Sequence, residues 1–174
     1  MTNTTLRGVT AALVLIAGLG SAAAQESTNV VATEGDWTVF AAENPKECWA
    51  VSPPKATQNT DANGAPREVT RGDIRLYVAY RPGQGGEVSF SGGYPFAPDS
   101  TVEVDVGGTK FRLFTEGENA WAGSPEEDTR LVAALRGGSS AVVTGRSARG
   151  TTTTDTFSLA GVTAATNKAR EICK

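Results

Sequence analysis

The sequence predicts a mainly β fold, an antiparallel sandwich or barrel with one or two short peripheral helices. From Val30 onward, short runs of β-forming residues alternate with turn residues at close spacing, which is typical of these architectures. One segment, 124–137, carries a full set of helix start and stop signals. With 39% hydrophobic and 20% charged residues, the chain has enough apolar material to bury a core.

The first residues are typical of a secretory signal peptide. Arg7 precedes the apolar run 9–19, and Ala22-Ala23-Ala24 follows. A positive start, a short apolar run and an Ala-x-Ala site predict cleavage after Ala24. A transmembrane anchor is the alternative, but the run of about ten residues is shorter than the roughly 20 needed to span a bilayer. We therefore expect a signal peptide at 1–24, and a single domain at 25–174 without a transmembrane segment.

The composition argues against several functional classes. The net charge of −3 at pH 7, spread along the chain, gives no basic footprint for nucleic acid or anionic lipid. The chain has no histidine, which excludes Ser-His-Asp and Cys-His catalysis and histidine-bearing zinc sites. The acidic residues at 116–118 and 126–128 do not fit the spacing of a calcium-binding loop. We expect no cofactor, no metal and no enzymatic activity.

Cys48 and Cys173 are the only two cysteines. In an exported protein, two cysteines most simply form one disulfide. The alternative is a free nucleophilic thiol, which needs an activating partner that a chain without histidine does not easily supply. A disulfide would fasten the C-terminus to an early strand.

The predicted strands follow in order. The first three lie at 30–31, 37–40 and 48–51. The stretch 52–67, rich in Pro, Asn, Asp and Gly, predicts a long loop or a loose hairpin. Apolar residues alternate with others over 74–80, as in a half-buried strand, and 87–90 is its expected hairpin partner.

The segment "TVEVDVGGTKFRLF", 101–114, predicts a hairpin with Gly107-Gly108 as a two-residue turn. This register places Asp105 opposite Lys110 and Glu103 opposite Arg112 on a solvent face. Val104 and Phe111 then face the core. A shift of one residue breaks both charge matches at once, so the register is well specified.

Residues 124–137 predict the clearest helix. Ser124 is the N-cap, Pro125 takes the first helical position, Glu127 completes a capping box, and Gly137 ends the helix. The apolar stripe that would dock on a sheet consists of Leu131, Val132 and Leu135.

The remaining elements are two strands and a final helix. The strands are expected at 141–144 and 153–159, and the helix at 162–172. The four threonines at 151–154 suit an exposed edge strand.

Three aromatic residues are the candidate binding residues. Tyr94 and Phe96 lie in "FSGGYPFAPDS", 90–100, which combines flexible glycines with two prolines. On a recognition loop they would serve as anchors, whereas folded inward they would form a lid on the core. Trp121 follows polar residues that suggest a partly exposed loop.

Several segments, taken in order, resemble the invasion-associated locus B family of exported alphaproteobacterial proteins. "GDWTVF" at 35–40, followed by Cys48, is similar to the family's Trp-x-Val-x-Cys opening. "PFAPDSTVEVDVGG" at 95–108 resembles its Pro-rich loop and hairpin. The helix at 125–137 and "SLAGVTAA" at 158–165 resemble later landmarks.

The resemblance implies an immunoglobulin-like β-sandwich located in the periplasm, on the outer membrane or outside the cell. It implies no catalytic residues, and the family's name implies host interaction. Many members carry two local cysteine pairs. Here Phe40 stands where the first cysteine is expected, and Leu113 and the loop around Trp121 stand where the second pair would be. The resemblance therefore leaves Cys173 as the partner of Cys48.

Three hypotheses about function remain open at this point. The first is a non-enzymatic exported module that binds a protein or an envelope component. The second is a structural or chaperone-like envelope protein that pairs through exposed sheet edges. The third is a hydrolase with an unfamiliar site of acids, Ser and Arg. An exposed aromatic patch favours the first, a bare edge strand the second, and a deep pocket with convergent acids the third.

Overall fold

The structure, a computed structural model, describes residues 29–174, so the predicted signal peptide at 1–24 lies outside the described residues. The described part is mainly β, with two short helices, which confirms the predicted class. The strands are β1 (Val30–Glu34), β2 (Trp37–Glu43), β3 (Lys46–Ser52), β4 (Ala56–Thr60), β5 (Arg75–Tyr80), β6 (Glu87–Ser91), β7 (Thr101–Val106), β8 (Thr109–Glu116), β9 (Asn119–Ala122), β10 (Ser140–Arg146) and β11 (Thr152–Ser158). The helices are α1 (Pro125–Gly137) and α2 (Val162–Ile172).

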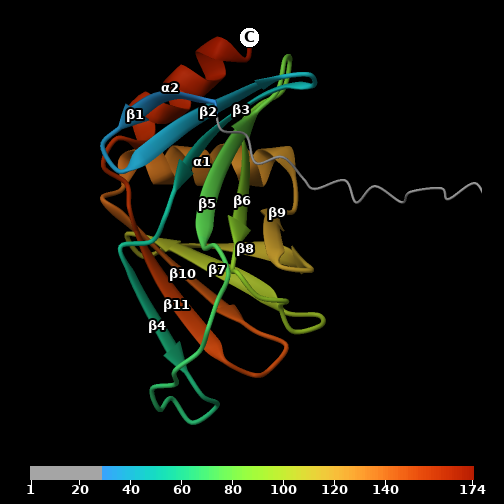
Figure 1. Cartoon of the computed structure of the whole chain (residues 1–174), viewed down its shortest axis with the longest axis vertical. Coiled ribbons are helices and arrows are strands. Elements are labelled where there is room, and N and C mark those ends of the chain that lie inside the picture. The colour runs from blue at the N-terminus through green and yellow to red at the C-terminus, as the bar shows by residue number, and fades with distance from the viewer. Residues whose placement is uncertain (1–28) are drawn as a thin grey trace, which may run out of the picture.

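Hydrogen bonds join all the described strands into one antiparallel sheet, in the order β1-β2-β3-β5-β6-β9-β8-β7-β10-β11-β4. Side chains from strands that are far apart in this order touch each other, which shows that the sheet folds back on itself. Phe90 of β6 meets Phe157 of β11 edge to face, with ring centroids 6.1 Å apart. The indole of Trp37 in β2 donates a hydrogen bond to the carbonyl of Ser158 at 3.0 Å. One core therefore lies between two halves of the sheet. In Figure 1, the half with β1, β2, β3, β5 and β6 lies toward one end of the molecule, and the half with β7, β10, β11 and β4 lies toward the other.

Helix α1 forms where the sequence predicts it. The Ser124 hydroxyl accepts a hydrogen bond from the backbone of Glu127, and Glu127 accepts one from the backbone of Gly123. The first bond satisfies a donor that the first turn leaves free, whereas the second holds the residue before the N-cap and not, as in the predicted capping box, the N-cap itself. Leu131 and Leu135 are fully buried, so the predicted apolar stripe docks on the sheet.

Helix α2 lies beside β1, β2 and β3 at the C-terminal end of the chain (Figure 1). It begins after Gly161, which has a φ of +92° and sits where any Cβ would collide with the carbonyl of Glu34. This close approach requires glycine. The helix carries Cys173 to β3, where it forms a disulfide with Cys48 with a Cα–Cα distance of 5.9 Å. Both half-cystines are buried.

The hairpin of β7 and β8 has the predicted register, with Asp105 opposite Lys110, Val104 opposite Phe111 and Glu103 opposite Arg112. Val104 is fully buried, and Phe111 is half-buried against the core. The ion pair differs from the directly opposed pairs that the sequence predicts. Lys110 reaches diagonally to Glu103 at 2.7 Å, because Asp105 instead caps the turn by accepting from the backbone of Gly108.

The loose hairpin predicted within 52–67 is confirmed, since Thr60 forms an antiparallel bridge with Pro66 and the backbone of Arg67 donates to the carbonyl of Asn59. Its first arm is β4, which the sequence did not predict and which pairs with β11 through five residues.

One prediction about the strands needs correction. The threonines at 151–154 were expected on an exposed edge, but β11 lies between β10 and β4, with Thr151 and Thr153 buried. Neither β4 nor the interior position of β11 could be predicted from these polar residues, because threonine occurs in edge strands and in interior strands.

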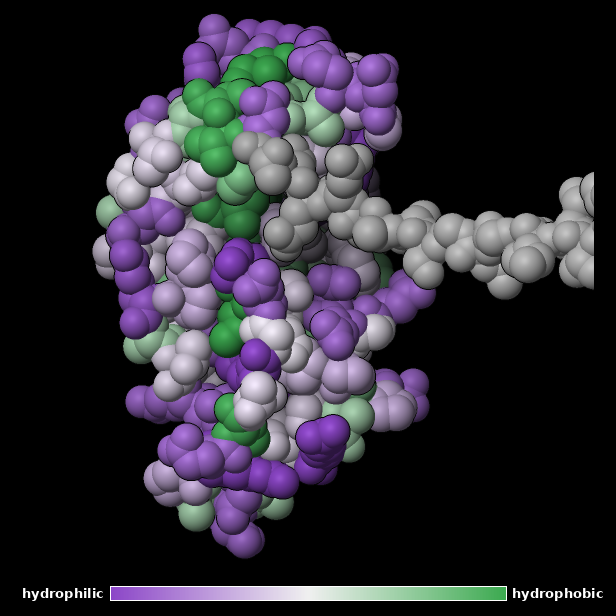
Figure 2. All heavy atoms as spheres, in the orientation of Figure 1, coloured by the Kyte–Doolittle hydropathy of each residue, from purple (hydrophilic) through white to green (hydrophobic). Residues whose placement is uncertain are grey.

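Hydrophilic residues dominate the face seen in Figure 1. Figure 2 shows hydrophobic residues on it only as a narrow, interrupted strip. The large hydrophobic side chains that are exposed in the described residues are Val30, Val31 and Phe114. Of these three side chains, only that of Phe114 is aromatic.

Candidate functional site

Phe96 is a core residue, so of the two alternatives for this ring the structure supports the inward-folded lid and not the anchor on a recognition loop. Its side chain is only 7% exposed and packs against the rings of Phe90 and Tyr94, with centroids 6.2 Å and 5.0 Å away. The backbone of Phe96 also donates to the carbonyl of Gly117 at 2.9 Å. The loop folds inward because burying the ring removes a large apolar area from water.

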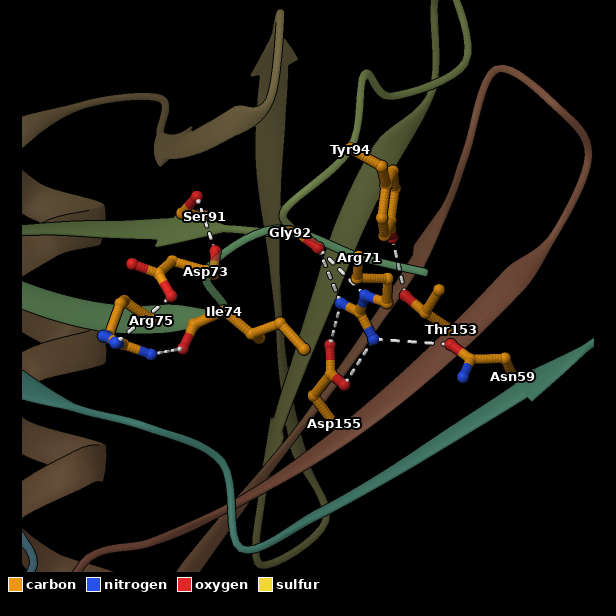
Figure 3. Close-up of polar contacts among 10 residues, drawn as sticks. All are labelled: Asn59, Arg71, Asp73, Ile74, Arg75, Ser91, Gly92, Tyr94, Thr153 and Asp155. Carbon is orange, nitrogen blue, oxygen red and sulfur yellow. Dashed lines mark hydrogen bonds and ion pairs between the residues drawn. The ribbon is translucent and has the colours of Figure 1, made fainter. Parts of the chain in front are cut away.

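Tyr94 is half-buried and takes part in a polar network. Its hydroxyl and that of Thr153 are 2.6 Å apart, and burial raises the pKa of the Tyr94 phenol. The guanidinium of Arg71 lies over the Tyr94 ring, 5.0 Å from its centroid (Figure 3). The ring thus covers the centre of this network.

The centre of the network is a buried ion pair between Arg71 and Asp155, whose side chains are 6% and 0% exposed. The guanidinium donates to both carboxylate oxygens at 2.7 Å, twice to the carbonyl of Gly92 at 3.0 and 2.8 Å, and to Asn59 at 3.4 Å (Figure 3). These bonds use all the N–H groups of an arginine. Burial raises the pKa of Asp155, and Arg71 opposes that rise. The pair therefore fastens the segment before β5 to β11 and offers no free donor to a ligand.

A cavity of about 510 Å³ opens beside this network, and we call it the polar cavity. Tyr94 forms part of its wall. Other lining residues include Arg67, Glu68, Thr70, Glu118, Ser147 and Arg149. Acids and bases line it together, so its charge points to no single class of ligand.

Trp121 lies on β9, not on the loop that the sequence suggests. It stands directly opposite Phe114 of β8, and the two rings stack with centroids 5.8 Å apart and planes 30° from parallel. Their neighbours Leu113 and Ala120 are fully buried. Since side chains alternate along a strand, Phe114 and Trp121 both point to the outer face.

Phe114 is the residue that sequence reasoning missed. Taking Gly117-Glu118 as a two-residue turn pairs Glu116 with Asn119 and therefore Phe114 with Trp121. Pairing residues outward from the turn, as was done for the β7–β8 hairpin, would have predicted this aromatic pair.

Beside the two rings lies a second hollow of about 490 Å³, which we call the aromatic hollow. It lies where the outer face meets the first turn of α1. It is lined by Glu87, Phe114, Glu116, Trp121, Ala122, Gly123, Ser124, Pro125 and Asp128. The lining residues thus combine two aromatic rings with three carboxylates and no base.

Asp128 is the most enclosed of these carboxylates, with 9% of the residue exposed. One carboxylate oxygen accepts a hydrogen bond from the backbone of Val88 at 2.7 Å. Burial raises the pKa of Asp128, the bond from Val88 opposes the rise, and the charges of Glu87 and Glu127 add to it. Crowded negative charge is thus a property of this hollow.

The other two acids of the hollow differ in their partners. Glu87 forms an ion pair with Arg81 at 3.1 Å, and Arg81 also pairs with Glu47. Glu116 is exposed, and none of the ion pairs in residues 29–174 involves it. Glu116 and Asp128 therefore carry the uncompensated charge.

Among the residues that the structure describes, no three Asp, Glu or Cys side chains are placed to hold a metal ion. No helix in that part of the chain is long and apolar enough to cross a membrane. The outermost strands of the sheet are β1 and β4, and β1 exposes Val30 by 54%.

Comparison with known proteins gives a family and a fold. The family model described as "Invasion associated locus B (IalB) protein" matches residues 37–170. The crystal structure of invasion associated protein B from Bartonella henselae is similar at a TM-score of 0.55 and 18% identity. The match covers 81% of this chain and 96% of that chain. No curated protein matches the chain.

Proposed function

Because the chain belongs to the invasion-associated locus B family, we propose that it is an exported, non-enzymatic protein that binds a protein or envelope component through the aromatic hollow. The periplasm, the outer membrane and the cell exterior are the compartments that this proposal covers. A role in host interaction falls within the same proposal, by analogy with the invasion-associated protein of similar fold.

The observation that carries the proposal is the exposure of Phe114. Its side chain is 49% exposed on a strand inside the sheet, where it stacks on Trp121. Covering a water-exposed aromatic ring with a partner surface makes a favourable contribution to the free energy of binding. Aromatic residues also dominate the energetics of protein interfaces. A pair of rings beside a hollow offers such a partner both an apolar surface and a recess.

Export is supported by the signal-peptide pattern at 1–24 and by the disulfide between Cys48 and Cys173, since disulfides persist in oxidising compartments. Mass spectrometry of the protein from the periplasmic or secreted fraction should give an N-terminus at Gln25. An intact Met1 in a cytoplasmic pool would contradict export.

A second candidate function uses the sheet edge instead. Val30 and Val31 on β1 are the other exposed large hydrophobics of residues 29–174, and β1 has a strand partner on one side only. An exposed edge can pair with a strand from another chain, as structural or chaperone-like envelope proteins do.

One experiment separates the two candidates. The mature protein, Phe114→Ser and Val30→Ser are immobilised, and each captures material from an envelope extract. If the aromatic hollow is the binding site, Phe114→Ser loses a component that the other two proteins retain. Loss in Val30→Ser alone would support the edge instead, and the same capture by all three would refute both.

A further inference from the structure

We propose that the aromatic hollow receives an arginine or lysine side chain from an exposed basic segment of a protein partner. The inference rests on the proposed function and names the chemistry of the partner.

Charge complementarity selects the occupant. The hollow is lined by Glu87, Glu116 and Asp128, and no lysine or arginine lines it. Arg81 compensates Glu87 from outside the lining, and Glu127 adds a further acid from the same turn of α1 as Asp128. An anionic or apolar partner would therefore place its surface against uncompensated carboxylates, whereas a cation would neutralise them.

The aromatic rings point to the same occupant. An arginine or lysine cation is attracted to the negative face of an aromatic ring, and arginine also stacks on it through its planar guanidinium. Phe114 is exposed enough to offer such a surface, and Trp121 supports it by stacking from the neighbouring strand. The chain already contains this kind of contact, with Arg71 lying 5.0 Å from the Tyr94 ring centroid.

Asp128 is placed to receive the charged head of the side chain. One carboxylate oxygen is held by the backbone of Val88, so the carboxylate is fixed in position before a ligand arrives. Burial disfavours the ionised form of Asp128, and the charges of Glu87 and Glu127 add to this effect, which a bound cation would offset. The size of about 490 Å³ leaves room for one long side chain and part of its backbone.

Two glutamates in one turn provide a matched pair of variants. Glu116 and Glu118 flank Gly117 at the β8–β9 turn, and both have exposed side chains. Glu116 lines the aromatic hollow, whereas Glu118 lines the polar cavity. Glu116→Gln and Glu118→Gln therefore remove the same charge from nearly the same place, but only the first removes it from the proposed site.

The probe is a short, end-blocked peptide of glycine and arginine, compared with an analogue in which citrulline replaces arginine. Citrulline keeps the shape of the side chain and removes its charge. Binding is followed by NMR through the indole N–H of Trp121. We expect the arginine peptide to bind the mature protein about tenfold more tightly than the citrulline peptide, and Glu116→Gln to remove most of that preference. Glu118→Gln should keep it.

Equal binding of the two peptides, equal losses in the two variants, or no binding of the arginine peptide would overturn the inference. Its failure is distinguishable from that of the proposed function. If Phe114→Ser loses envelope capture while the arginine peptide shows no preference, the site stands and its cationic occupant does not. If Phe114→Ser captures normally, the proposed function itself fails.

Discussion

Phe114 and Trp121 face each other across β8 and β9, with ring centroids 5.8 Å apart on the outer face of the sheet. An aromatic pair in this position contributes little to the core, because Leu113 and Ala120 are the neighbours that point inward. The pair stands instead beside carboxylates at the start of α1. The structure thus separates the residues that build the fold from those that are available to a partner.

The first prediction follows from that separation. Phe114→Ser should lower the free energy of unfolding by no more than about 1 kcal/mol, since it removes one cross-strand pair from an exposed surface. Chemical denaturation of the variant and the mature protein measures this difference. Phe90→Ser is the contrasting variant, because that ring is fully buried, and it should cost several times more. Comparable losses in both variants would show that Phe114 is a packing residue.

A second prediction concerns the buried ion pair. Arg71→Ala should lower the free energy of unfolding by about 3–5 kcal/mol, because it leaves the carboxylate of Asp155 buried without its partner. Arg75→Ala is the matched control. Arg75 lies 3.4 Å from Asp73, whose side chain is 71% exposed, so its loss should cost about 1 kcal/mol or less. Similar costs for the two variants in denaturant titrations would refute the assigned role of Arg71.

The third prediction concerns the disulfide. Cys48 and Cys173 are separated by 125 residues, and in the chain-entropy model a loop of this length is worth at most about 4–5 kcal/mol. Cys173→Ser should therefore melt at a lower temperature yet keep its β-sheet circular dichroism, since other residues make the core. Labelling of both cysteines by a thiol reagent in the native, oxidised protein would show that no bond forms.

The fourth prediction is a pH dependence. The folded state raises the pKa of Asp128 above its ordinary value of 3.8, so between the two values the folded state binds more protons than the unfolded state. The contribution of Asp128 to stability is therefore favourable below this window and declines as the pH rises through it.

Asp128→Asn isolates that contribution. The amide keeps an oxygen that accepts from the backbone of Val88 and removes the titration. Stability measured from pH 3 to pH 7 should show the variant gaining on the mature protein as the pH rises. A stability difference that is constant with pH, or a variant that becomes less stable relative to the mature protein as the pH rises, would contradict the raised pKa.

Much of the fold follows from local sequence signals. The hairpin of β7 and β8 and helix α1 are predictable because Gly107-Gly108 and Ser124-Pro125 determine local geometry without help from distant residues. Helix α2 also begins and ends at the predicted residues, 162 and 172. For the hairpin and α1, the apolar pattern agrees with the turn and capping signals.

The features that escaped prediction depend on long-range partners. β4 consists of polar residues and becomes a strand only because β11 pairs with it. Arg71 and Asp155 are 84 residues apart and look like ordinary surface charges in the sequence. The aromatic hollow joins residues of β6 to residues of β8, β9 and α1, and β6 lies far from these three in the sequence. Their grouping emerges only when the sheet places β9 beside β6.

The fifth prediction tests the central claim, that the aromatic hollow is the surface that meets a partner. A photo-crosslinking analogue of phenylalanine replaces Phe114 in one strain and Val30 in another, and intact cells of both are irradiated. We expect a crosslinked adduct of higher mass from position 114 and none from position 30. An adduct from position 30 alone, or none from either position, would contradict the account.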